Sequence, residues 1–261
     1  MVGSEIEARF IDLIEDMTAA WREAPNPQPV VMPDMTRASL SDAGAIAVIW
    51  GWTARVMRMA ESALLLHREG FDTELAPLVR SMLEHAIALP WVADKRGRAY
   101  QTLARERADG WSRFKAAQTD AWTLEGEAAA LLESAIHVET DEDTHSENTL
   151  LRTLHRAQTY NLEPLYQAWL LETWSTHATM TSAEPYFDVD PETLRGTLNR
   201  TGSGAPAGYQ ISGGIAIAVH TSLASYEKVD AAAYPRRLNE WETTFEQIMS
   251  DIRKGRDLSS S

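Results

Sequence analysis

Apolar residues recur every three or four positions along most of the chain, which is the periodicity of amphipathic helices. This pattern predicts helices over residues 4–24, 41–69, 73–94, 97–135, 147–160, 163–180, 208–229 and 235–254. No segment combines strict apolar–polar alternation with the Val, Ile and Thr enrichment that is typical of strands. We therefore expect an all-α fold, a single helical bundle of about seven to nine helices.

Turn-forming residues separate the predicted helices. Gly70 follows the second helix at a position typical of a helix C-terminus, and Asp72 and Thr73 can cap the helix that comes next. So short a connection predicts an antiparallel helix pair. Asp190 and Pro191 form a cap and first-turn pair, which predicts a short helix through residues 192–197.

The segments that are rich in Pro, Gly, Ser and acidic residues are expected to be loops: 25–36, 139–147 and 199–214. None of them reads as a long disordered linker. We therefore expect one domain over residues 1–261, with a core of about 40–190 and the N- and C-terminal helices packed on it.

The composition mainly excludes classes of protein. A hydrophobic content of 44% suffices for a sizeable core, and the absence of cysteine excludes disulfides, thiolate nucleophiles and cysteine-ligated zinc. No apolar run approaches the roughly 20 residues that span a bilayer. The first residues are acidic and do not resemble a signal peptide. We expect no membrane span and a cytoplasmic location.

The charge balance disfavours generic nucleic-acid binding. The chain has 38 Asp and Glu against 24 Lys and Arg, a net charge of −14, which repels polyanions. Basic residues do gather between positions 95 and 115, where we interpret them as the solvent-facing side of an amphipathic helix. Metal-ligand spacing occurs only as Glu142 to His145, in an acidic loop, so we expect neither a metal nor a cofactor.

Three ionisable residues interrupt an otherwise apolar stretch, "LVRSMLEHAIALPWVAD", over residues 78–94. At about 100° per residue, Arg80 and Glu84 lie on the side opposite the core face, and His85 lies at the edge of the polar arc. One interpretation is an ordinary (i, i+4) ion pair beside a histidine at the core edge. The other interpretation is a functional site.

The functional interpretation depends on a later helix, which carries Ser175 and His177. If that helix faces Arg80 and Glu84, the four side chains would line one pocket, in which Glu84 orients His85 or His177 as a base. Tyr166 and Trp91 would supply ligand contacts. The Arg80–Glu84 pair would then be partly buried, and Glu84→Ala would destabilise the fold by about 3 kcal/mol or more.

Two stretches resemble a widespread family of uncharacterised, all-helical bacterial proteins: "VRSMLEHAIAL" and "YQAWLLETWSTHATM". That family is similar in its R-x-x-x-E helix and in a later segment with an aromatic residue, a serine and a histidine. The matching positions are Arg80, Glu84, Tyr166, Ser175 and His177, and the resemblance covers about residues 40–190. It implies no established activity.

The hexapeptide "RSMLEH" also resembles the R-x(4–6)-H motif of HEPN domains, with Ser81 where those enzymes often carry another polar residue. The resemblance implies a metal-independent endoribonuclease, such as a toxin or a phage-defence effector. His85 or His177 would be the base and Arg80 would bind phosphate, with the two groups meeting across a homodimer.

Two functions therefore remain open. The chain is either a bundle that binds a small ligand or a protein partner through the polar pocket around Arg80 and Glu84, or the endoribonuclease, in which case RNA is its partner. The direction in which Arg80 points would discriminate between them.

Overall fold

A computed structural model describes residues 2–25, 36–119, 122–137, 142–190, 192–193, 195–200, 208–229, 234 and 236–259. Its α-helices are α1 (Val2–Glu23), α2 (Arg37–Arg68), α3 (Ala76–Lys95), α4 (Gly97–Ala116), α5 (Gly126–Ile136), α6 (Thr153–Thr159), α7 (Glu163–Thr176), α8 (Met180–Ala183), α9 (Gly208–Glu227) and α10 (Arg237–Ser259). Three 3-10 helices accompany them: η1 (Thr73–Leu75), η2 (Glu142–Leu151) and η3 (Glu184–Tyr186). The predicted all-α class is confirmed.

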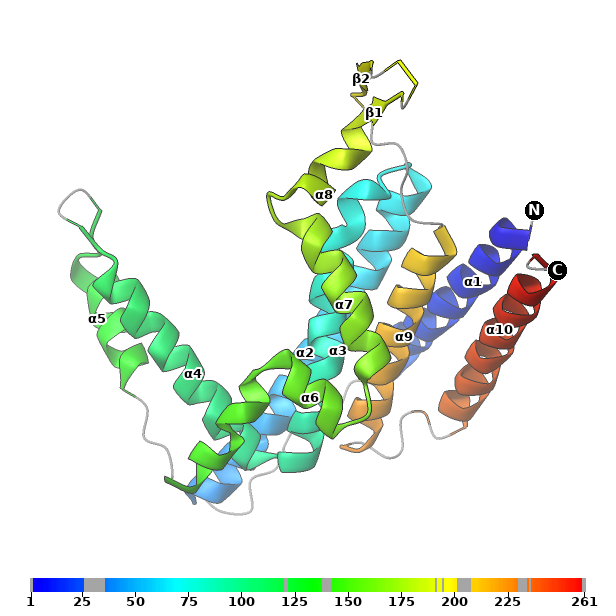
Figure 1. Cartoon of the computed structure of the whole chain (residues 1–261). Coiled ribbons are helices and arrows are strands. Elements are labelled where there is room, and N and C mark those ends of the chain that lie inside the picture. Colours follow the sequence, from blue (N-terminus) through cyan, green and yellow to red (C-terminus); the bar gives the residue numbers. More distant parts are fainter. Residues whose placement is uncertain are drawn as a thin grey trace.

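Helix α3 lies at the centre of the structure. It packs against α2, α7 and α9, while α1 packs on α9 and α10 packs on α1 (Figure 1). Side chains of α3 that are fully buried include Met82, Leu83, Ile87, Leu89 and Trp91. Because α3 is covered on several sides, its few polar residues must lie at the seams between helices.

The turn between α2 and α3 forms where the sequence predicts it. Gly70 has a φ of +79°, and its amide donates to the His67 carbonyl at 3.0 Å. The connection to α3 differs in detail, because η1 precedes that helix and Asp72 makes no cap hydrogen bond. The Asp72 carboxylate lies 2.5 Å from Nδ1 of His67 instead.

Three predicted helices differ from the structure. The 147–160 segment is divided at Arg152 into the end of η2 and α6. The 97–135 segment is divided into α4 and α5, with Thr119 and Trp122 paired in a β-bridge between them. Of the predicted helix 192–197, the described residues 192, 193 and 195–197 belong instead to a hairpin of β1 (Phe187–Val189) and β2 (Gly196–Leu198). Asp190 does act as a cap, but of this turn: its Oδ1 accepts from the amides of Glu192 and Thr193.

The described residues therefore form ten α-helices, and not seven to nine. The predicted loop 25–36 and the first part of 139–147 lie largely outside the described residues, whereas 142–147 belong to η2. Part of the third predicted loop, 208–214, is the first two turns of α9.

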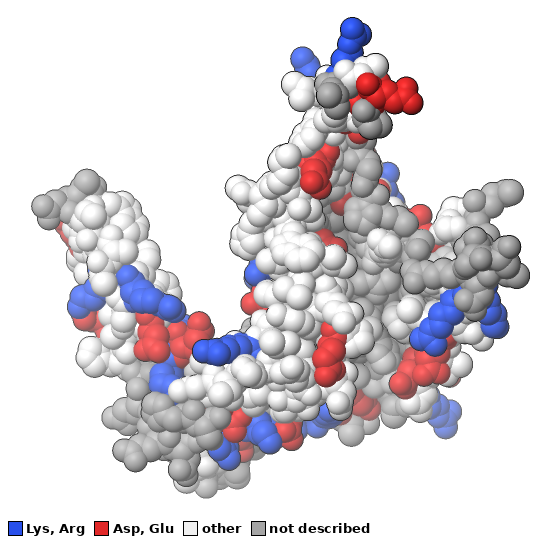
Figure 2. All heavy atoms as spheres, viewed as in Figure 1, with Lys and Arg blue, Asp and Glu red and all other residues white. Residues whose placement is uncertain are grey.

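Helices α4 and α5 form an arm that projects from the bundle (Figure 1). Basic and acidic side chains alternate along it (Figure 2). Arg98 pairs with Glu147 at 3.3 Å, and Lys115 pairs with Glu133. The exposed Lys115–Glu133 pair agrees with the interpretation of the basic segment as an ordinary solvent-facing helix side, whereas Arg98 pairs with a buried carboxylate.

Among the described residues, no helix combines the length and the hydropathy that a bilayer crossing requires.

The packing of α2 on α4 gives a test of the fold. A Cβ at Gly44 would lie 2.5 Å from the Tyr100 ring, whereas a Cβ at Gly51, on the same helix, would meet nothing within 4 Å. Gly44→Ala should therefore lower the free energy of unfolding by about 1–3 kcal/mol through overpacking. Gly51→Ala, the matched control, should raise it by about 0.5–1 kcal/mol. Urea denaturation measures both, and equal shifts would contradict this packing.

Candidate functional site

Arg80 is held between α3 and α7. Its Nε donates to Oγ1 of Thr173 at 3.0 Å, and its guanidinium lies 5.2 Å from the centre of the Trp169 ring. Trp169 in turn stacks on Tyr166, with ring centres 5.5 Å apart. Arg80 therefore points at α7, as the functional interpretation predicts, but it meets aromatic and hydroxyl groups there and not a histidine.

The Arg80–Glu84 pair is looser than the sequence predicts. The two side chains approach to 3.7 Å and are 25% and 42% exposed. A half-buried pair at this distance, which water still reaches, contributes under about 1 kcal/mol, because water screens the charges. The sequence-based expectation that Glu84→Ala lowers the free energy of unfolding by about 3 kcal/mol holds only for a buried pair. For the pair in this structure, a smaller loss is expected.

The structure does not bring Ser175 or His177 to this pair. Helix α7 ends at Thr176, so His177 follows it with extended backbone (φ −90°, ψ 162°) and an exposed side chain. Ser175 lines a different cavity. The predicted site residues therefore fall into separate places, and only Glu84 and His85 line a common cavity.

That cavity, the Arg156 cavity, has a volume of about 230 Å³ and lies among α2, α3, α4, η2 and α6. It is lined by Trp52, Glu84, His85, Ala88, Leu103, Glu106, Leu151 and Arg156. Apolar and ionisable residues thus share the lining equally, so that a ligand here would meet both apolar surface and charged groups.

His85 contributes a neutral ring to this cavity. Its Nδ1 lies 2.6 Å from the Ser81 carbonyl, which can only accept a hydrogen bond, so Nδ1 carries the proton. The ring edge meets Trp52, with centres 5.5 Å apart. Burial, and then the nearby positive charge of Arg55, lowers the pKa of His85 against the opposing bond to Ser81. At neutral pH the Nε2 atom is therefore a hydrogen-bond acceptor.

Arg156 is the residue that sequence reasoning missed. It is only 6% exposed, and one of its terminal nitrogens donates to Oγ1 of Thr153 at 3.3 Å. Its Nε is buried with no hydrogen-bond partner, and no carboxylate lies within ion-pair distance among the described residues. Burial lowers the pKa of Arg156, while the charges of Glu84 and Glu106 act in the opposite direction.

Trp91 is part of the core and does not line the cavity. It is fully buried, and its Nε1 donates to Oε2 of Glu147 at 3.2 Å. Its ring supports the Arg156 guanidinium, 5.9 Å from the ring centre. Trp91 can therefore position Arg156 but cannot touch a ligand in the cavity as predicted.

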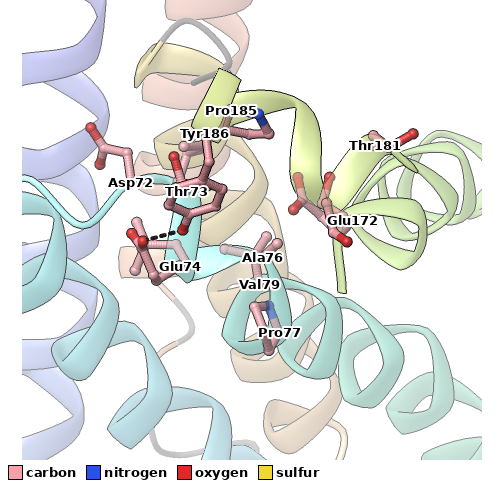
Figure 3. Close-up of a pocket in the computed structure, with 14 residues that line it drawn as sticks. Asp72, Thr73, Glu74, Ala76, Pro77, Val79, Glu172, Thr181, Pro185 and Tyr186 are labelled. Atoms are coloured by element: carbon pink, nitrogen blue, oxygen red, sulfur yellow. Dashed lines mark hydrogen bonds between the residues drawn. The ribbon is translucent and has the colours of Figure 1, made fainter. Parts of the chain in front are cut away.

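A second cavity of about 260 Å³ lies where η1 and the start of α3 meet α7, α8 and η3. Figure 3 shows Asp72 and Glu74 on one side and Glu172 and Thr181 on the other. Tyr186 closes one edge, because its hydroxyl donates to Oε1 of Glu74 at 2.5 Å. The structure describes no partner for the Glu172 carboxyl, and burial raises the pKa of that group to about 7.

A family model matches residues 46–193, more than half of the chain, and describes a family of unknown function, DUF5677. The chain belongs to the DUF5677 family. The matched range agrees with the 40–190 covered by the resemblance to uncharacterised helical proteins. Comparisons with curated proteins and with solved structures gave no match.

The DUF5677 range contains every residue that lines the Arg156 cavity, from Trp52 to Arg156. The second cavity also uses Ile211 of α9, which lies beyond that range. The Arg156 cavity is thus built entirely within the DUF5677 region, and it is the candidate functional site.

The looseness of the Arg80–Glu84 pair predicts a contrast between two substitutions. Glu84→Ala should lower the free energy of unfolding by less than about 1 kcal/mol, because the pair is screened. Arg80→Ala should be more damaging, by about 1–3 kcal/mol, because it removes the bond to Thr173 and the packing on Trp169. A loss near 3 kcal/mol for Glu84→Ala in urea denaturation would instead indicate a buried charge.

From the buried carboxyl of Glu172 we expect the free energy of unfolding to depend on pH. A pKa of about 7 in the fold, against 4.5 for the free side chain, means that the folded chain binds the extra proton. Stability should therefore fall as pH rises from about 4.5 through 7. Glu172→Gln should differ from the wild type by under about 1 kcal/mol at pH 5 and exceed it by up to about 3 kcal/mol at pH 8.

The control for Glu172 is Glu163→Gln, an exposed carboxylate at the start of the same helix. It should shift stability by the same amount at pH 5.5 and pH 8, because it removes an exposed carboxylate and leaves the buried carboxyl of Glu172 in place. Guanidinium denaturation at several pH values measures both variants. A pH-independent effect of Glu172→Gln would show that its carboxyl is ionised without penalty.

Proposed function

We propose that the chain binds a small ligand with an anionic group in the Arg156 cavity. The sequence leaves the binding of a small ligand open as one function and places the ligand beside Arg80. We keep that function and place the ligand instead in the neighbouring cavity that Glu84 and His85 line. One observation carries the proposal: the buried Arg156 guanidinium has an Nε without a partner.

A buried, ionised group is normally paired, because removal from water is costly unless opposite charge and hydrogen bonds replace the lost hydration. Arg156 has one hydrogen bond, to Thr153, and the face of Trp91. Because Arg156 lines the cavity, a carboxylate or phosphate group of a ligand there would supply the opposite charge that the guanidinium lacks. Arginine suits this role because its planar fork can donate two parallel bonds to such a group.

The size of the cavity favours a small ligand over a protein segment. Its volume of about 230 Å³ lies just below the roughly 300–1,000 Å³ of sites for drug-sized molecules. Trp52, Leu103 and Leu151 offer apolar contact, and Nε2 of His85 offers an acceptor. These groups can orient a ligand whose anionic end is held by Arg156.

One observation supports the endoribonuclease alternative: His85 and Arg156 line the same cavity. His85 could serve there as the base, and Arg156 could bind the phosphate. Arg80, to which the HEPN-like motif gives the phosphate, lies against Trp169 instead. The carboxylates of Glu84 and Glu106 line the cavity as well and would repel a polyanion. Cleavage of RNA oligomers that resists EDTA and is lost in His85→Ala would favour this alternative.

Arg156→Met tests the ligand-binding proposal. If the guanidinium serves a ligand, the unliganded variant should keep its free energy of unfolding within about 1 kcal/mol or gain stability, because an unpaired buried charge is removed. In a thermal-shift panel of carboxylates, phosphates and amino acids, a ligand that stabilises the wild type should have no effect on the variant.

The control is Arg152→Met, which removes an exposed arginine four residues earlier. It should respond to the same compounds as the wild type does. A destabilisation of several kcal/mol by Arg156→Met would show that Arg156 is structural. A panel without any stabilising compound would contradict the proposed function.

A further inference from the structure

We infer that the ligand is a zwitterion, a free α-amino acid with an apolar side chain, whose carboxylate binds Arg156 and whose ammonium binds Glu106. The inference rests on the proposed function and adds the chemical class of the ligand. It depends on the charges that surround the cavity.

Both signs of charge meet in this small space. Arg156 is buried on one wall, and Glu84 and Glu106 contribute carboxylates to the lining. Both carboxylates act on Arg156 electrostatically, so they lie near it without forming a direct ion pair. The cavity is thus polarised, with a fixed cation inside and anions beside it.

The two carboxylates are not equivalent. Glu84 already approaches Arg80 at 3.7 Å, whereas the structure describes no ion-pair partner for Glu106. Glu106 lies on α4, and its side chain is exposed, so it can turn toward a bound group. The neutral His85 adds an acceptor, Nε2, on the α3 side of the cavity.

A ligand with a single charge fits this arrangement poorly. A simple anion would satisfy Arg156 but would approach the two carboxylates, and a simple cation would approach the buried guanidinium. An α-amino acid carries both charges on one carbon atom, so that its carboxylate and ammonium can each meet the opposite charge. Its side chain would then lie against Trp52, Leu103 and Leu151.

Matched compounds test each charge separately by isothermal titration calorimetry on the full chain. The probes are L-leucine and L-phenylalanine, together with 4-methylpentanoate and 3-phenylpropanoate, which lack the amino group, and 3-methylbutylamine and 2-phenylethylamine, which lack the carboxylate. At least one amino acid should bind, and both of its analogues should bind roughly tenfold or more weakly, because each loses a charge-assisted hydrogen bond.

Two variants on α4 locate the ammonium. Glu106→Gln should reduce the affinity for the amino acid by roughly tenfold, whereas the affinity for the carboxylate analogue should stay the same or rise, because a nearby negative charge is removed. Asp109→Asn, an exposed acidic position one turn further along α4, should change neither affinity. Equal loss in both variants would indicate a general effect of charge and would overturn the role of Glu106.

The outcomes separate this inference from the proposed function. If the carboxylate analogue binds as tightly as the amino acid does, the zwitterion is wrong while the anion-binding role of Arg156 stands. The zwitterion is equally wrong if none of these probes binds but a phosphate or another carboxylate stabilises the wild type and not Arg156→Met. If no compound binds at all, both proposals fail.

Discussion

The burial of α3 is the constraint on which the rest of the structure depends. Three helices, α2, α7 and α9, pack against it, and its apolar residues supply much of the core. A polar residue of α3 must therefore lie at a seam between helices, where it finds partners on α3 itself or on a neighbouring helix. Arg80 does so at the α7 seam, where it meets Thr173 and Trp169, and His85 does so at the α2 seam, where it meets Trp52.

The same constraint explains why Arg80 and His85 do not form one site. Five residues along a helix correspond to a rotation of about 500°, which leaves the two side chains about 140° apart. With a different helix packed on each side, the two residues are directed to different seams. A motif of two fixed positions on one buried helix therefore identifies residues that leave the core, but it does not show that they meet.

The sequence predicts most of the fold because helical periodicity survives in every long segment. It fails at three places: at the Thr119–Trp122 bridge, at Arg152 between η2 and α6, and at Asp190, whose cap hydrogen bonds close a hairpin turn. A cap residue followed by proline is compatible with both a helix and a turn. Only the pairing of Phe187 with Leu198 distinguishes the two outcomes, and that pairing is not local.

The candidate site was harder to predict than the fold. Glu84 and His85 interrupt an apolar pattern, but Arg156 lies in a short helix, "TLHRAQT", whose seven residues are too few to define an apolar face. Its burial results from the packing of α6 on α3 and η2, which the local sequence does not contain.

Glu172 and Arg156 are both largely buried ionisable groups that lack a full set of partners among the described residues, but they differ in whether they can lose their charge. Glu172 can lose its charge by taking up a proton near neutral pH, since burial raises the pKa of this carboxyl to about 7. An arginine does not have that option, because the guanidinium stays protonated in proteins even where burial lowers its pKa. Arg156 therefore keeps its full charge in the fold without a ligand, and its Nε donates no hydrogen bond there. A stable bundle could replace such a group with an apolar side chain of similar length and lose little. Its presence in a cavity with a neutral acceptor and an exposed carboxylate is accordingly better explained by a bound molecule than by the folding of the chain.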